Sequence, residues 1–209
     1  MSGDEFVPRA GRLPLVGGAL ALDFCNTTSG LGTEHCLEHL IGFEHLVLWS
    51  AHAGAITIDG ADALRALATR EPATTHAALD RALALRRTLH RLFSALAHGG
   101  KAPPEALAGL NTALVPSHHD RHLVESAGGF VWHYPAPHLT ADGPLGPITR
   151  SAADVLLTTP LDRIKQCPGR DCGWLFIDRS KNGIRVWCEM EVCGSRAKAR
   201  ARAARRRSG

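Results

Sequence analysis

Four cysteines in the C-terminal quarter of the 209-residue chain restrict its fold more than any other feature. They form two pairs, Cys167-x4-Cys172 and Cys188-x4-Cys193, with fifteen residues between the pairs. The segment from Cys167 to Arg207 is too short to be stable through a hydrophobic core alone. It therefore needs either covalent cross-links or a bound ion.

Two disulfides, four separate thiols or a bound metal would each account for this pattern. The N-terminus, MSGDEFVPRAGR, is acidic first and has no apolar stretch, so we expect no secretory signal and a cytoplasmic location. Disulfides are rare in the cytoplasm, whereas paired cysteines there commonly hold metal. We predict one Zn²⁺ held by Cys167, Cys172, Cys188 and Cys193. Four thiolates leave no place for water, so the predicted site is structural and not catalytic.

The residues between the two pairs predict a β-hairpin. Residues 174–177 are an apolar run, and Asn182-Gly183 is a strong turn signal. Residues 184–187 then resume an apolar alternation, which is typical of a second strand. The hairpin would carry one cysteine pair to the other.

A basic tail follows the last cysteine. Residues 194–209 contain no acid and seven cations, which are Arg196, Lys198, Arg200, Arg202, Arg205, Arg206 and Arg207. Without these seven, 17 of the 24 basic residues remain against 20 acidic ones, so the preceding 193 residues carry a net charge of −3. This asymmetry is typical of an anion-binding arm, most often for nucleic acid, although a solvated terminus can have the same composition.

The tail also has high helix propensity. We predict a helix with Ser195 as its N-cap and with Ala197, Ala201 and Ala204 packed against the zinc hairpin. The cations would cover the rest of its surface.

The remainder of the chain predicts a mainly α-helical (α+β) domain with a minor β element. Apolar periodicity and end signals predict helices over residues 36–53, 60–69, 75–100, 103–115 and 151–159. The segment at 13–28 fits either a strand or a helix entry. FVWHY at 130–134 is strand-like, within a hairpin or an irregular crossing over 116–147. We expect the helical domain to span residues 1–160 and the zinc module to span residues 163–207.

Asp23, Asn26 and Arg86 are the candidates for a ligand-binding pocket in the helical domain. An apolar segment that ends in Asp and Asn could line a polar pocket together with an arginine on a core helix. The alternative, which we favour, is a buried salt bridge or an Asn that caps a turn.

Other candidates are weaker. His35 and His39 would lie four residues apart on a helix, but no HExxH-like constellation accompanies them, so ordinary surface histidines are favoured over a second metal site. Trp49 and Trp132 are expected in the core. There is no Ser-His-Asp order, glycine-rich phosphate loop or suitable carboxylate pair, and we therefore predict that the chain is not an enzyme.

The stretch CGWLFIDRSKNGIRVWCEMEVCGSRAKAR resembles the CGNR zinc finger, whose cysteines, tryptophans and turn occur in the same order and spacing. The preceding region resembles the ABATE domain through LALDFCNT at 20–27, Leu85-Arg86, LNTAL at 110–114 and SAADVLLT at 151–158. Two positions depart from the finger pattern. Ser195 replaces its Asn, and Val186 replaces an Arg that is common before the Trp-Cys pair.

The resemblance implies a bacterial transcription regulator that binds DNA through the finger and senses an effector through the helical domain. It makes the four cysteines the metal ligands. Charge and resemblance together give the nucleic-acid-binding candidates, which are Arg185, Arg196, Lys198, Arg200, Arg202 and Arg205. A small-molecule effector and a homodimer are further expected partners, and no membrane is expected. The alternative function is a zinc-stapled module that binds protein or RNA without sequence-specific DNA binding.

Overall fold

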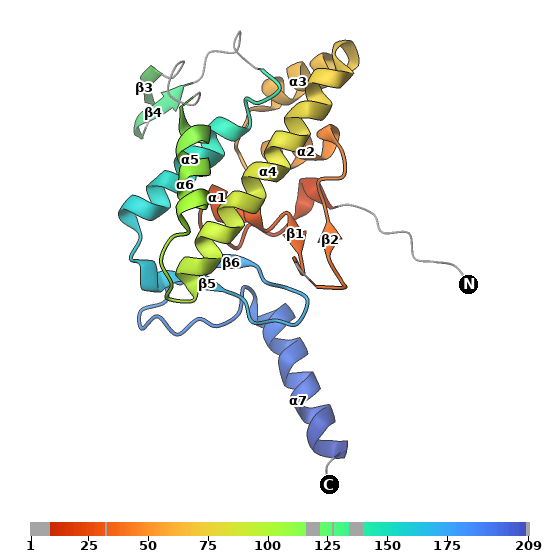
Figure 1. Ribbon diagram of the computed structural model, residues 1–209, viewed down its shortest axis with the longest axis vertical. Helices are drawn as coiled ribbons and strands as arrows, with labels where there is room; N and C mark the ends of the chain where they lie inside the picture. Colours follow the sequence, from red (N-terminus) through yellow and green to blue (C-terminus); the bar gives the residue numbers. More distant parts are fainter. Residues whose placement is uncertain (1–8, 32, 116–121, 127, 134–139, 208–209) are drawn as a thin grey trace, which may run out of the picture.

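The computed structural model describes residues 9–31, 33–115, 122–126, 128–133 and 140–207, and Figure 1 shows their arrangement. Helices dominate this part of the chain, and the strands form three two-stranded antiparallel sheets. A final helix extends away from the rest of the molecule. The predicted fold class, mainly α with a minor β element and a small C-terminal hairpin and helix, is confirmed.

The long helix α4 (Pro72–Ala97) is the centre of the fold. Leu89, Leu92 and Phe93 on this helix are completely buried, and each contributes about 1.5–3 kcal/mol through burial. Pro72 suits the first turn of the helix, because a proline lacks only an N–H that has no helical partner there. The sequence prediction of a helix at 75–100 is confirmed, with a start three residues earlier.

Shorter helices surround α4. It contacts α1 (Leu20–Cys25), α2 (Phe43–His52), α3 (Ile58–Arg70) and α5 (Pro104–Leu114), while α6 (Leu145–Thr158) packs against α1 and α5. A short 3-10 turn, η1 (Ala10–Arg12), lies against α2. Trp49 is fully buried, with its ring centroid 5.3 Å from that of Phe24, as predicted for a core residue. The side chain of Trp132 lies outside the described residues.

The helix predicted at 36–53 is wrong in its first third. Residues Leu37–Glu38 form strand β2, which pairs with β1 (Thr28–Ser29), and α2 begins only at Phe43 after Gly42 in an extended conformation. The Glu38 carboxylate accepts the Leu40 N–H at 2.8 Å, and this local bond competes with a helical turn. The two histidines of the suggested second metal site therefore do not lie on one helix face.

Two further hairpins follow along the chain. Strands β3 (His122–Ser126) and β4 (Gly129–His133) pair within the region where a hairpin or irregular crossing was predicted. After a 3-10 turn, η4 (Leu161–Arg163), strand β5 (Ile164–Gln166) pairs with β6 (Leu175–Ile177). The β5–β6 hairpin contacts α4, and β6 also contacts α1.

Among the residues that the structure describes, one hydrophobic core includes side chains of both the helical domain and the C-terminal module. Leu175 and Phe176 of β6 are completely buried in the same cluster as Leu22 and Phe24 of α1. Backbone bonds join the parts as well, since Ile177 N–H donates to Gly17 O at 2.9 Å and Gly30 N–H donates to Cys172 O at 2.9 Å. The C-terminal module is thus packed into the helical domain and not merely tethered to it.

Candidate metal centre and basic helix

The four cysteines predicted as ligands come together at the end of the β5–β6 hairpin. Their sulfur atoms all lie within 4.8 Å of one another. The Sγ of Cys188 is 3.6 Å from the Sγ of Cys172 and 3.6 Å from the Sγ of Cys193. Tetrahedral Zn–S bonds of about 2.3 Å place two sulfur ligands about 3.8 Å apart, so the cluster matches the size of a four-thiolate zinc site.

Backbone bonds shape each cysteine pair. Cys167 and Cys172 lie in the loop that joins β5 to β6, where Cys167 N–H donates to Trp174 O and Cys172 N–H donates to Gly169 O. A Cβ at Gly169 would lie 3.2 Å from the Sγ of Cys193, so this glycine leaves room beside the sulfurs. Of the second pair, Cys188 precedes the π-helical segment η5 (Met190–Gly194), and Cys193 lies within it.

The electrostatics of the cluster favour a bound cation. Hydrogen bonds from the Cys172 and Cys188 thiols lower the pKa of Cys167. The same contacts with Cys167 and Cys172, together with burial, raise the pKa of Cys188. Four thiolates at this distance repel one another and can coexist only around a positive ion.

The predicted hairpin between the cysteine pairs is corrected in its pairing. The turn exists, since Gly183 N–H donates to Ser180 O and Gly183 has φ +65°. However, β6 pairs with β5, which precedes the first cysteine, and residues 184–187 are not a strand. The strand partner of β6 comes from a segment that the local sequence pattern did not mark.

Side chains take the place of a strand partner along residues 178–188. The buried Asp178 carboxylate accepts the backbone N–H of Ser180 at 2.9 Å and that of Arg185 at 2.9 Å. The Lys165 ammonium binds the Asp178 carboxylate at 2.7 Å and also donates to the carbonyls of Gly183 and Arg185. Burial raises the pKa of Asp178, but the Lys165 and Ser180 hydrogen bonds outweigh burial and hold it below its ordinary value.

Sequence reasoning missed the role of Asp178 and Lys165. A local signal existed, because an Asp followed two residues later by Ser is a common turn in which the carboxylate accepts the Ser N–H. The Lys165 contact spans 13 residues and had no such signal.

Arg185 is a predicted nucleic-acid contact, but its side chain binds groups within the protein. Its guanidinium lies over the Phe176 ring, 4.3 Å from the centroid, and donates to the carbonyls of Val16, Trp187 and Cys188. The side chain therefore fixes the loop that leads to the second cysteine pair.

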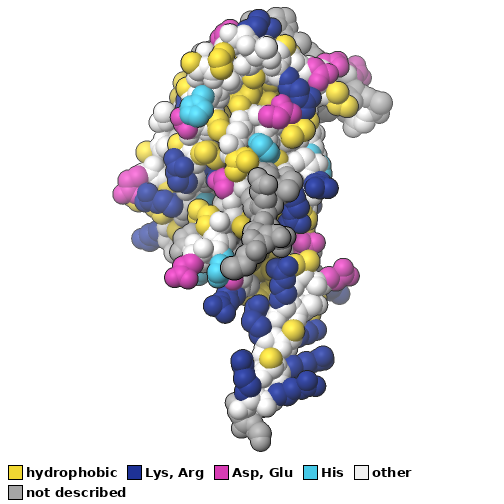
Figure 2. All heavy atoms as spheres, turned by 90° about the vertical axis from the view of Figure 1, so that its right-hand side faces the viewer, with side chains coloured by type: hydrophobic (Ala, Val, Ile, Leu, Met, Phe, Trp, Pro, Cys, Tyr) yellow, Lys and Arg dark blue, Asp and Glu magenta, His cyan; other side chains and the backbone are white. Residues whose placement is uncertain are grey.

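The other predicted contacts lie on α7 (Ser195–Arg207), which directly follows the last cysteine. All seven cations of this helix are exposed, and none has a side-chain hydrogen bond or ion pair with any other residue that the structure describes. Figure 2 shows their side chains along the projecting helix. Arg196, Lys198, Arg200, Arg202 and Arg205 thus lie together on one exposed basic helix.

Two details of the predicted helix are corrected. Ser195 is already helical, with φ −65° and ψ −41°, because α7 continues from the η5 turn and needs no side-chain cap. No residue of α7 is buried, so the alanines do not pack against the hairpin. The helix stands free of the core instead.

The three ligand-pocket candidates have structural partners. The Asn26 amide and the Leu175 backbone exchange two buried hydrogen bonds, at 2.8 and 2.9 Å. The Arg86 guanidinium, with 5% of its side chain exposed, binds the Glu38 carboxylate and Thr27 Oγ1. The Asp23 carboxylate accepts the Gly17 N–H at 2.7 Å, and burial raises its pKa to about 6.

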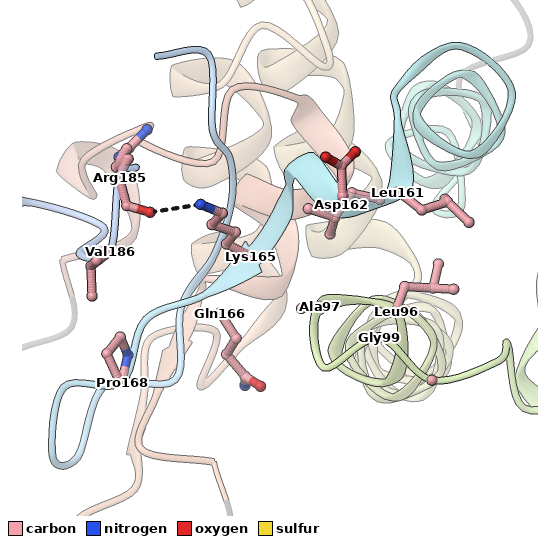
Figure 3. Close-up of a pocket in the computed structure, with 12 residues that line it drawn as sticks. Leu96, Ala97, Gly99, Leu161, Asp162, Lys165, Gln166, Pro168, Arg185 and Val186 are labelled. Atoms are coloured by element: carbon pink, nitrogen blue, oxygen red, sulfur yellow. Dashed lines mark hydrogen bonds between the residues drawn. The ribbon is translucent and has the colours of Figure 1, made fainter. Parts of the chain in front are cut away.

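A hollow suited to a small molecule lies elsewhere in the described structure. It has a volume of about 550 Å³ and lies between the C-terminal end of α4 and the zinc module, as Figure 3 shows. Leu96, Leu161 and Val186 give it an apolar lining, and the Lys165 ammonium on its wall donates to the Arg185 carbonyl.

Within the described residues, no helix is long and apolar enough to cross a membrane.

Comparison with protein families gives two matches along the chain. Residues 163–206 match the CGNR zinc finger, and residues 18–160 match ABATE, described as "Putative stress-induced transcription regulator". No curated protein matches the chain. Since the ABATE match covers more than half of the sequence and the finger match covers the cysteine cluster and α7, the chain belongs to the ABATE family and carries a C-terminal CGNR zinc finger.

Proposed function

We propose that the chain is a DNA-binding transcription regulator whose basic helix α7 contacts the phosphate backbone. The observation that carries this proposal is the exposed position of seven cations on a helix that begins directly after the cysteine cluster. Phosphate contacts by Arg and Lys supply most of the affinity of a protein for nucleic acid. The family matches, a regulator and a zinc finger, support the same role.

In this proposal Cys167, Cys172, Cys188 and Cys193 hold one structural zinc ion. The sulfur separations fit that ion, and a closed set of four thiolates leaves no position for substrate. Bound zinc would fix the η5 turn from which α7 starts. The ion thereby sets the direction in which the basic helix leaves the protein, and it performs no reaction.

We assign phosphate contacts to Arg196, Lys198, Arg200, Arg202 and Arg205. Arg185 is excluded because its guanidinium serves the core of the module. Residues 1–160 would then form the regulatory part and residues 163–207 the DNA-binding part of a cytoplasmic protein. A homodimer belongs to the same proposal, and light scattering of the purified protein measures it.

A small-molecule effector would fit the hollow of Figure 3 better than a site at Asp23, Asn26 and Arg86. Asp23, Asn26 and Arg86 are buried and bonded internally. The hollow has the volume of many small-molecule sites and touches both family segments. A ligand there would contact α4 on one side and the zinc module on the other.

The decisive experiment is a fluorescence anisotropy titration of a labelled DNA duplex at several salt concentrations. If about five of the seven cations meet phosphates, the logarithm of affinity should fall against the logarithm of salt concentration with a slope of roughly −4.5. Truncation after Ala199 removes five cations. It should weaken binding to all duplexes by the same factor, because contacts with phosphates do not depend on the base sequence.

Two double variants distinguish the effect of losing cations from α7 from the effect of lowering the net charge of the protein. Arg202→Gln with Arg205→Gln removes two of the assigned phosphate contacts from α7, and Arg70→Gln with Lys101→Gln removes two exposed cations from the helical domain. The first pair should make the salt slope shallower by about 1.8, and the second should leave it unchanged. Equal binding by the full-length and truncated proteins, or an affinity that ignores salt, would refute the proposed function. Binding to RNA or to an acidic protein in place of DNA would favour the alternative module.

A further inference from the structure

The cations of α7 form two rows on opposite sides of the helix. Successive residues of an α-helix are rotated by about 100°, so every position on α7 has a defined direction. Arg196, Arg200 and Arg207 project within a sector of about 40° and form the first row. Lys198, Arg202 and Arg205 project within about 60° on the opposite side and form the second row.

The two remaining sides of α7 differ from each other. One side, between the rows, carries only Ala197, Ala201 and Ala204, which we call the alanine side. The side opposite to it carries Ala199, Ala203 and the cation Arg206. The helix projects beyond the folded core, so the alanine side and both cation rows are open to a large partner (Figures 1 and 2).

The two opposed rows indicate whether α7 lies along one phosphate strand or within a groove between two strands. A helix that lies along one phosphate strand brings one row to that strand and leaves the other in solvent. A helix of about 10–12 Å diameter within a major groove about 12 Å wide has a phosphate strand on each side. Only in the groove do both rows reach phosphates.

Other nucleic acids fit this surface less well. The major groove of double-stranded RNA is too deep and narrow for side chains to read. Single strands are bound through aromatic side chains on which the bases stack, and α7 contains none. The chemistry of the surface therefore selects duplex DNA.

We propose that α7 enters the major groove of duplex DNA with its alanine side toward the base edges and one cation row on each phosphate strand. This inference rests on the proposed function. It specifies the groove that α7 enters, the side of α7 that faces the bases and the residue that lies closest to them. Ala201 is the middle one of these three alanines along the helix axis. Its methyl group allows the helix axis to come close to the bases.

The test compares the same substitution on two sides of the helix. Ala201→Glu places a carboxylate against the base edges, whereas Ala199→Glu places it on the opposite side, away from the DNA. Both residues are exposed, both variants change the net charge equally, and each new Glu has two cations three or four residues away. We expect Ala201→Glu to bind a mixed-sequence duplex at least about ten-fold more weakly than Ala199→Glu, because like charges brought together in an interface are strongly unfavourable.

The rows are tested by two double variants in the same anisotropy assay. Arg196→Gln with Arg200→Gln, and Lys198→Gln with Arg202→Gln, should each make the salt slope shallower by about 1.8. A change with only one of the double variants, or equal affinities of the two Glu variants, overturns the groove geometry while leaving DNA binding in place. A wild-type protein that binds no duplex overturns the proposed function as well, so the two failures are distinguishable.

Discussion

Asn26→Ala should destabilise the whole chain, because this side chain joins α1 to the zinc module. The Asn26 amide acts as a peptide group toward Leu175, donating from Nδ2 to the carbonyl and accepting the N–H at Oδ1. Both bonds are buried, and Asn26 and Leu175 are 2% and 0% exposed. Alanine would leave two backbone groups of β6 without partners.

The magnitude follows from those two groups. A buried backbone donor or acceptor without a partner costs about 1–3 kcal/mol, so the loss in unfolding free energy should be about 2–6 kcal/mol. Since the core is continuous across α1 and β6, we expect one cooperative transition in which the helices and the zinc module unfold together.

The assay is urea denaturation followed by circular dichroism for the helices and by zinc release for the module. Asn111→Ala is the matched control, because Asn111 is an exposed residue of α5 and its loss should cost less than about 0.5 kcal/mol. A loss below about 1 kcal/mol for Asn26→Ala would refute the reasoning about unsatisfied groups. Coincidence of the two signals tests cooperativity separately, and early zinc release at low urea would contradict the single-core argument.

Three further predictions concern buried charges and the cysteine cluster. Cys188→Ser should lower the zinc content from one ion per chain to nearly none, measured by elemental analysis, while Cys36→Ser, at an exposed cysteine outside the cluster, should leave it unchanged. Arg86→Met removes the partner of the half-buried Glu38 and should cost up to about 3–5 kcal/mol in denaturant unfolding at neutral pH, with a loss below about 1 kcal/mol arguing against a structural role. Burial raises the pKa of Glu38, but the contact with Arg86 outweighs burial and holds this pKa below its ordinary value. The ionised Glu38 therefore stabilises the folded state at pH values above the ordinary carboxyl pKa. This stabilisation is lost as the pH falls through the lower pKa of the folded state. The stability gap between wild type and Arg86→Met should therefore shrink below about pH 4, and a gap that is constant with pH would contradict this linkage. Asp178→Asn should release the loop at 178–188 and speed the reaction of the zinc-module thiols with a chromogenic disulfide, and an unchanged rate would show that Lys165 and Arg185 hold the loop without the carboxylate.

The sequence was most informative where the determinants are local. The central helix α4 follows from apolar periodicity and from the glycines after its end, and these signals act within a few residues. The cysteine cluster was also foreseeable, because each x4 pair has only a short loop to close. The exposed α7 kept its local preference, because none of its residues is buried against the rest of the protein.

The errors have a common physical origin in long-range partners. Residues 184–187 have a strand-like pattern, but β6 pairs with β5, and the Asp178, Lys165 and Arg185 side chains satisfy the backbone of the later segment. Residues 36–42 have a helical pattern, but Glu38 is drawn to Arg86, 48 residues away. A local pattern cannot rank such alternatives, because the stabilising partner lies elsewhere in the chain.

The amino-acid sequence by itself determined the zinc-ligand set that we propose, the mainly helical body and the separate basic arm. These depend on residue chemistry and on spacing along the chain. Only the tertiary structure decided that Asn26 and Arg86 support the core, that Arg185 faces Phe176 and that the zinc module shares the core of the helical domain. Asn26 and Leu175 are 149 residues apart, and a buried polar group takes whichever partner the completed fold brings within hydrogen-bonding distance.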